Sequence, residues 1–321
     1  MNGTGRPDYA AQGESTRPPK AAGLHGGAGG GVRFQHLTFG VVPGEEPFTV
    51  GTDAGSIGGW RAGSGEPVVL LHGGPGLSEY LDTLVEELAE GYTTFRYQQR
   101  GLDPSTTDGP FTVERHVEDA FAVIDHIGED RVLLLGHSWG GHLAMHFAIR
   151  FPERIKGLLI VDPLGAVGDG GEAEMSANMV ARVPPSDMSR SQEFDEAAMR
   201  GEGTADHAIE GLRLVWPGYF ANPEDAPPMP PLQMSLPCYA GTWESIHDHL
   251  SAGTLENGLP SVGVPTAFVL GAGSPLPPAH GEASAALIPG AEVRIVEGAG
   301  HFPWMERPGV VRAALDSLLI R

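Results

Sequence analysis

LLLGHSWGG, residues 133–141, is the stretch that decides the fold of this chain. Its apolar half is typical of a buried strand, and it runs straight into the helical pattern of residues 139–150. Glycine at 136 and 140 permits a sharp turn from strand to helix, which exposes the Ser138 hydroxyl at the sheet edge. A glycine-rich chain can produce Gly-x-Ser-x-Gly by chance, but the flanking strand and helix favour a nucleophilic serine.

Short apolar runs alternate with helical patterns on either side of this turn. The predicted strands are 68–71, 92–97, 131–136, 156–161, 265–270 and 293–296, after two antiparallel strands at 32–42 and 48–60. The predicted helices are 79–90, 113–127, 139–150, 281–287 and 309–320. This alternation predicts an α/β fold, with a mostly parallel twisted sheet and helices on both faces.

Three parts of the chain differ in composition. Residues 1–31 are rich in glycine and poor in large apolar side chains, so we expect a disordered tail. Residues 165–263 contain helix-like pieces and proline clusters without a comparable strand, which predicts a helical cap or lid. The α/β core is therefore expected over 32–164 and 264–321.

Two loops would complete the chemistry of Ser138. The helix that follows the serine offers the Trp139 N–H to a developing oxyanion. The Gly-rich loop after residues 68–71 offers a second donor, for which we choose Gly74, with Gly73 as the alternative. His301 follows the predicted strand 293–296 on another Gly-rich loop, where an imidazole can act as base and then as acid.

Together these motifs resemble the α/β-hydrolase superfamily. HGGPG at 72–76, YQQRG at 97–101 and GHFPW at 300–304 are most similar to the proline iminopeptidase branch of serine hydrolases. The resemblance implies an α/β-hydrolase fold with a helical cap insertion. Gln98 departs from the family's Asp, which we interpret as a change in loop support. Ser274 stands where the resemblance places the triad acid.

Asp162 is our candidate for the displaced acid. It ends the predicted strand 156–161, and the order Ser138, Asp162, His301 suits a triad. A loop residue that bonds its own backbone before Pro163 is the alternative interpretation. Glu297 and Glu306 are weaker rivals, the first being close to His301 in sequence and the second a helix-capping candidate.

Composition excludes several classes of protein. The formal charge of −21 disfavours nucleic acid and anionic membranes as partners. Cys238 is the only cysteine, which excludes an internal disulfide framework and a cysteine-based metal site. His142 and His146 have ligand spacing without a third ligand, so we predict neither metal nor cofactor. No secretory or membrane segment is visible, and we expect a cytoplasmic protein.

The predicted function is cleavage of a small, hydrophobic ester, amide or N-terminal aminoacyl bond through an acyl-enzyme. The resemblance implies that acidic cap residues hold a substrate amino group, and Glu244 beside Trp243 is our candidate. A lyase, cyclase or acyl-transfer enzyme on a natural-product intermediate is one alternative. A non-catalytic pseudo-hydrolase that binds a ligand is the other, because Ser274 replaces the acid. The expected partner is a small molecule or short peptide, and the oligomeric state stays open.

Overall fold

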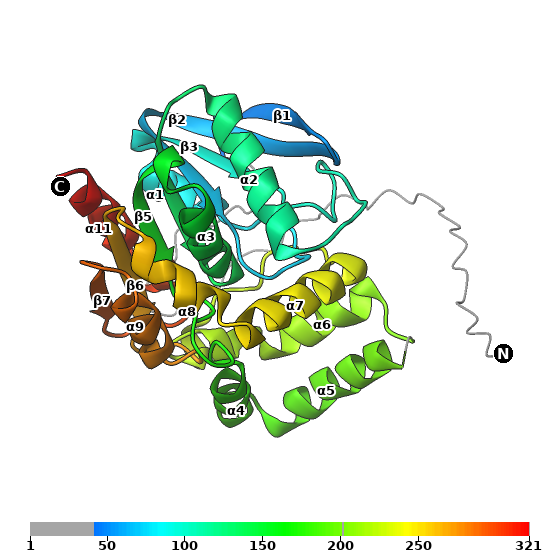
Figure 1. Cartoon of the computed structure of the whole chain (residues 1–321). Helices are drawn as coiled ribbons and strands as arrows, with labels where there is room; N and C mark the ends of the chain where they lie inside the picture. The colour runs from blue at the N-terminus through cyan, green and yellow to red at the C-terminus, as the bar shows by residue number, and fades with distance from the viewer. Residues whose placement is uncertain (1–41, 201, 321) are drawn as a thin grey trace. The chain divides into compact units, whose positions relative to one another are not determined.

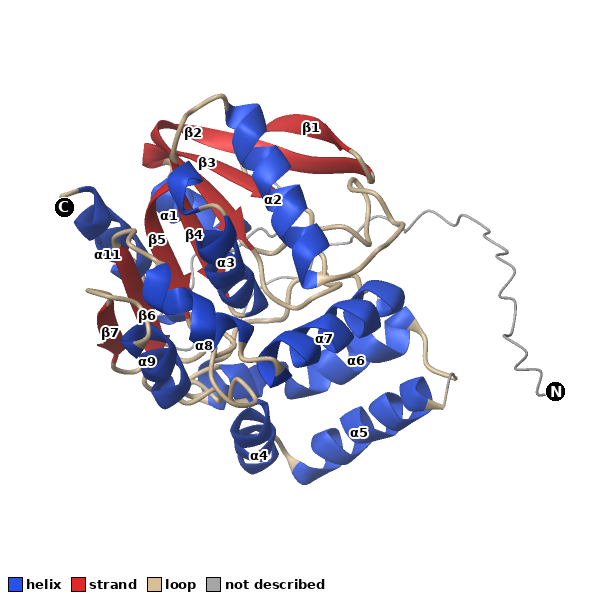
Figure 2. Cartoon of the chain, in the orientation of Figure 1, coloured by secondary structure: helices blue, strands red, loops and turns tan. Residues whose placement is uncertain are grey.

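A seven-stranded sheet organises residues 42–200 and 202–320, the part of the chain that this computed structural model describes (Figure 1, Figure 2). Its strands are β1 Glu46–Thr52, β2 Gly55–Leu71, β3 Glu90–Tyr97, β4 Val132–His137, β5 Ile155–Val161, β6 Thr266–Gly271 and β7 Glu292–Val296. The order is β1-β2-β4-β5-β6-β7, with β3 also paired to β2. The first three strands pair antiparallel and the others parallel. The predicted α/β class is therefore confirmed.

Helices cover both faces of this sheet. One face carries α2 (Val113–Ile127), α3 (Trp139–Arg150), α8 (Thr254–Gly258) and α9 (Pro278–Ala286), and the other carries α1 (Asp82–Leu88) and α11 (Val310–Leu319) (Figure 1). Side chains alternate between the two layers: Leu134 belongs to the first core cluster, whereas Leu133 and Leu135 belong to the second. This burial on both faces explains why the strand sequences are continuous apolar runs.

The N-terminal strands differ from the prediction. Residues 48–60 form two strands, because the chain turns at 53–54 and pairs Thr52 with Gly55. The second strand then continues to Leu71, since Gly63 and Gly65 adopt positive φ and absorb shifts in register with β3. The predicted helix 79–90 is shorter, because Glu90 already begins β3. The tail 1–31 and nearly all of the predicted strand 32–42 lie outside the described residues.

The stretch between β5 and β6 is helical in the part that the structure describes. It contains α4 (Glu172–Arg182), α5 (Pro185–Met199), α6 (Ala205–Val215), α7 (Leu236–Ser251), α8 and the 3-10 turns Trp216–Tyr219, Pro223–Asp225 and Leu259–Ser261. Two further short elements, Pro152–Arg154 and α10 Pro303–Glu306, lie outside this stretch. Leu255 and Leu259 join the core cluster of α3, so the end of the predicted cap packs directly on the core. Among the described helices, none is long and apolar enough to span a membrane.

Candidate active site

Ser138 lies on a strained turn between β4 and α3. Its φ of 56° and ψ of −123° are unusual for a residue with a side chain. A Cβ added to Gly136 would lie 2.1 Å from the carbonyl oxygen of Gly140, and one added to Gly140 would lie 2.1 Å from that of Leu71. Only glycine fits at both positions. The turn leaves Ser138 half-buried, between fully buried neighbours.

His301 and Asp162 meet beyond the ends of β5 and β7, two strands that flank β6 in the sheet. Asp162 directly follows β5, and His301 lies in the loop after β7. His301 Nδ1 lies 2.6 Å from Asp162 Oδ2, with both side chains almost fully buried. Because a carboxylate can only accept, Nδ1 carries the proton and donates it, which leaves Nε2 free to accept. This is the tautomer that a general base next to a serine requires.

Ser274 bonds the same carboxylate oxygen of Asp162 as His301 does. The Ser274 hydroxyl donates to Asp162 Oδ2 at 2.6 Å, and the Gly271 N–H donates to Oδ1 at 3.0 Å. The Leu276 N–H in turn donates to Ser274 Oγ at 3.1 Å, which fixes the hydroxyl as a donor toward the carboxylate. The serine at the position where the resemblance places an acid therefore donates to the carboxylate of Asp162, which follows the neighbouring strand β5.

Glu297 and Glu306, the two alternatives to Asp162 as the triad acid, lie in different surroundings. Glu297 is exposed to solvent. Glu306 accepts the N–H of Ala221 at 2.9 Å and that of Gly300 at 2.5 Å, so it caps two backbone donors. Burial raises the pKa of the Glu306 carboxyl. Glu306 thus connects the cap to the loop of His301.

The glycine loop after β2 adjoins the serine. A Cβ added to Gly73 would lie 2.6 Å from Ser138 Cβ. The Gly73 N–H already donates to Tyr80 Oη at 2.9 Å, which occupies the alternative oxyanion donor. Gly74 takes the left-handed conformation, with φ of 60°. This geometry favours Gly74 over Gly73 as the second donor, beside the Trp139 N–H at the start of α3.

Gln99 connects the glycine loop to the serine turn. Its backbone N–H donates to His72 Nε2 at 3.2 Å, and its side-chain amide donates to the His72 carbonyl at 2.8 Å. The same amide accepts the indole N–H of Trp139 at 2.9 Å. Burial lowers the pKa of His72 to about 4, so this ring is neutral at neutral pH. Sequence reasoning missed this role, although the motif that contains Gln99 signalled an important loop.

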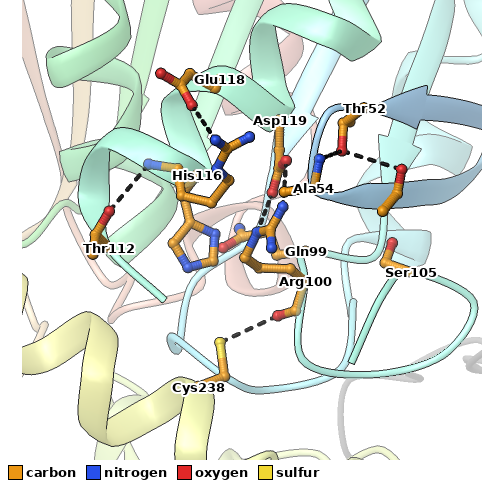
Figure 3. A network of polar contacts seen from close by, with 12 residues as sticks. Thr52, Ala54, Gln99, Arg100, Ser105, Thr112, His116, Glu118, Asp119 and Cys238 are labelled. Carbon is orange, nitrogen blue, oxygen red and sulfur yellow. Dashed lines mark hydrogen bonds and ion pairs between the residues drawn. The ribbon is translucent and has the colours of Figure 1, made fainter. Parts of the chain in front are cut away.

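Arg100 anchors the same loop in the core (Figure 3). Its guanidinium forms a fork with Asp119 of α2, at 2.6 Å from Nε and 2.7 Å from Nη2. Both side chains are buried, and the third nitrogen, Nη1, donates to the Asp108 carbonyl at 3.1 Å. The Cys238 thiol of α7 lies 3.2 Å from the Arg100 carbonyl (Figure 3). The single cysteine thus packs α7 against this loop.

Gln98 supports the far end of the glycine loop. Its amide oxygen accepts the Glu79 N–H at 2.9 Å, and its amide nitrogen donates to the Leu77 carbonyl at 3.2 Å. Glu79 forms a buried ion pair with Arg96, which also pairs with Glu45 at 2.7 Å. An amide at position 98 can both accept from and donate to backbone groups, which a carboxylate cannot. The substitution therefore fits our interpretation of altered loop support.

Glu244 and Trp243 lie on α7. Glu244 is exposed and lines a surface cavity of about 470 Å³ whose other lining residues are Thr112, Glu114, Gly241, Ser245, Asp248, His249, Ala252 and Thr254. None of these is a predicted catalytic residue. Trp243 is half-buried and packs against His247. The amine-anchor role of Glu244 stays a prediction.

His142 and His146 are core side chains of α3. Their Nε2 atoms lie 3.3 Å apart, and His142 Nδ1 lies 3.2 Å from the Gly165 carbonyl. Burial lowers the pKa of His142 to about 4. Over the described ranges, no group of three or more histidine, cysteine or acidic side chains is placed to hold a metal ion.

Comparison with known proteins decides the family. The sequence profile described as "Alpha/beta hydrolase family" matches residues 68–314. The chain belongs to the alpha/beta hydrolase family. This α/β-hydrolase chain is 39% identical over 104 residues to a proline iminopeptidase of Thermoplasma volcanium, a match that covers 31% of this chain and 35% of the relative.

A second curated relative and a solved structure are also similar to this alpha/beta hydrolase. It is 35% identical over 136 residues to 2-hydroxy-6-oxo-2,4-heptadienoate hydrolase of Pseudomonas putida, covering 39% of this chain and 46% of the relative. An alpha/beta fold family hydrolase structure from Bacillus anthracis superposes with a TM-score of 0.66 at 16% identity, covering 85% of this chain and 99% of the other. The matches thus span less than half the length of these two curated relatives, whereas the fold matches over 85% of this chain.

Proposed function

We propose that this protein is a serine hydrolase that works through an acyl-enzyme. The contact of His301 Nδ1 with Asp162 Oδ2 at 2.6 Å is the observation that carries the proposal. The Ser138 N–H donates to the carbonyl of Val161, the residue before Asp162, at 3.0 Å. A carboxylate in this position orients the imidazole and stabilises its protonated form during reaction. The family relatives named above as an iminopeptidase and a hydrolase support the same class of chemistry.

The proposed reaction has two halves. Ser138 Oγ attacks the substrate carbonyl carbon while His301 Nε2 takes the hydroxyl proton, and the Trp139 and Gly74 N–H groups stabilise the oxyanion. The same proton then goes to the departing alcohol or amine, which leaves an acyl-serine. In the second half His301 removes a proton from water and the hydroxide attacks the ester carbon. The bond from that carbon to Ser138 Oγ then breaks, His301 returns the proton to the serine oxygen, and the carboxylic acid product leaves. No cofactor enters this sequence of steps.

The proposed substrate is a small ester, amide or N-terminal aminoacyl compound with a hydrophobic acyl group. Iminopeptidase activity in a relative motivates the aminoacyl option. In that option Glu244 and Trp243 would bind the substrate, which places the amino end toward α7. The contact between His301 and Asp162 argues against a non-catalytic ligand-binding protein, because that alternative depended on a missing acid.

Labelling with a fluorophosphonate tests the proposal. We expect the wild-type protein to be labelled and to turn over aryl esters or aminoacyl amides, and Ser138→Ala to lose both properties. Ser186→Ala, a change at an exposed cap serine, is the matched control and retains both. An unlabelled wild-type protein with no turnover across a panel of both substrate types would overturn the proposal.

A further inference from the structure

Tyr80 and His137 form a buried chain of hydrogen bonds between three loops of the site. The Gly73 N–H lies 2.9 Å from Tyr80 Oη, which lies 2.8 Å from His137 Nδ1. His137 Nε2 lies 2.8 Å from the carbonyl oxygen of His301. The chain therefore begins on the glycine loop, passes through the residue that precedes the serine, and ends on the backbone of the proposed base.

The chemistry of its end groups fixes every proton in this chain. The His301 carbonyl can only accept, so His137 carries a proton on Nε2. Burial holds the pKa of His137 well below its ordinary value, so the ring is neutral and its Nδ1 is bare. Nδ1 must then accept from the Tyr80 hydroxyl, whose own oxygen accepts the Gly73 N–H. Burial also raises the pKa of Tyr80, which keeps the hydroxyl proton in place.

Packing confines both side chains. Tyr80 is 8% exposed and His137 is fully buried. Their rings meet edge to face at 5.7 Å, and the His137 ring lies 4.7 Å from that of His301 and 4.8 Å from that of Trp304. A shift of either side chain would therefore move the neighbouring loops with it.

We propose that Tyr80 and His137 are positioning residues for the hydrolysis described above. Tyr80 sets the position of Gly73, and thereby of the Gly74 donor, while His137 sets the position of His301 relative to Ser138. Neither side chain needs to contact the substrate. The inference rests on the proposed function for its kinetic consequence, and on the hydrogen-bond geometry and burial of the two side chains for the proton positions.

Removal of one hydroxyl tests this arrangement. In Tyr80→Phe, Gly73 N–H and His137 Nδ1 lose their partner while the ring contacts remain. Since misplacement of reacting groups by about 1 Å costs on the order of 10²-fold, we expect kcat to fall by about 10- to 100-fold, with KM changed less than about threefold. Tyr92→Phe is the matched control, because it removes another interior hydroxyl, bonded to Asp316, and leaves kcat unchanged.

Two variants of His137 test the other end of the chain. A glutamine amide can still donate to the His301 carbonyl, whereas leucine cannot, so His137→Leu loses at least about tenfold more kcat than His137→Gln. A kcat within about twofold of wild type in folded Tyr80→Phe would overturn the positioning role.

A nitrogen NMR measurement separates this inference from the proposed function. The wild-type protein should show a neutral His137 with its proton on Nε2, and Tyr80→Phe should shift the signal of the bare Nδ1. Failure of the proposed function appears as a wild-type protein without Ser138-dependent labelling, and the nitrogen signals still decide the hydrogen-bond chain in that case. A proton on His137 Nδ1 would refute it.

Discussion

Asp162→Asn is the change that most directly tests the relocated acid. The carboxylate now accepts three hydrogen bonds, from His301 and Ser274 on Oδ2 and from Gly271 on Oδ1. Asparagine offers one oxygen and one NH₂ group in the same space. Asparagine also tolerates the positive φ of 41° at this position, so the exchange tests charge and hydrogen bonding and leaves backbone strain almost unchanged.

Both orientations of the new amide are unfavourable. If its oxygen faces His301, its NH₂ group opposes the Gly271 N–H, and a buried donor loses its acceptor. If its NH₂ group faces His301, the imidazole must accept on Nδ1 and carry its proton on Nε2, where it cannot take the Ser138 proton. The corresponding loss in serine triads is on the order of 10⁴ in kcat, or about 5 kcal/mol of transition-state stabilisation.

Steady-state turnover of an aryl ester or aminoacyl amide measures this loss. Asp169→Asn is the matched control, since its carboxylate accepts the backbone N–H groups of Gly171 and Ala173 and has no contact with His301 in the described hydrogen bonds, and we expect unchanged turnover. Ser274→Ala removes one of the three donors and keeps the contact with His301, so an intermediate loss of about tenfold is expected. A folded Asp162→Asn protein with activity within about threefold of wild type would refute the assignment of the acid.

Two further predictions concern stability. Burial lowers the pKa of His72 and His142 to about 4, below the ordinary 6.5. The unfolded chain therefore binds their protons first as pH falls, and the free energy of unfolding drops by about 1.4 kcal/mol per histidine and pH unit between 6.5 and 4. Urea titrations near pH 7.5 and 5 measure this, and equal stability would contradict it. Glu306→Ala leaves the partly buried N–H groups of Ala221 and Gly300 without this acceptor and lowers the free energy of unfolding by about 2 kcal/mol in urea titrations. Glu297→Ala, at an exposed site, should not.

The sequence predicted the core helices more accurately than the N-terminal strands, for a physical reason. The helices at 113–127 and 139–150 have the predicted bounds, because a threonine cap and a glycine at the end define the first and the serine turn defines the second. The β1–β2 hairpin has no such signal, since its turn at 53–54 lies inside an otherwise continuous strand pattern. The predicted strands 48–60 and 68–71 are joined in the structure, because pairing with β3 accommodates the positive-φ glycines between them.

The same distinction applies to the site. Motifs located Ser138, His301 and both candidate oxyanion loops, because each follows a strand end in a recognisable pattern. Asp162 could be proposed from its place after β5, but the donor role of Ser274 could not, since it depends on two loops that are 112 residues apart in sequence. The hydrogen bond from the Gly73 N–H to Tyr80 could not be predicted from the sequence either. It favours Gly74 over Gly73 as the second oxyanion donor.

Gln99, Tyr80 and Glu306 take no part in the proposed reaction, and their hydrogen bonds explain why they lie at the site. The proposed serine mechanism requires three loops held in register, and each of these loops is bound through side chains that lie outside the proposed reaction. Gln99 joins His72 to Trp139, Tyr80 joins Gly73 to His137, and Glu306 joins Gly300 to the cap. Since each contact spans a different pair of loops, the loss of one should misplace only the groups at its own ends. Variants of these residues should therefore differ in the step they slow, with Tyr80 and Gln99 affecting the oxyanion loop and Glu306 the loop of the base.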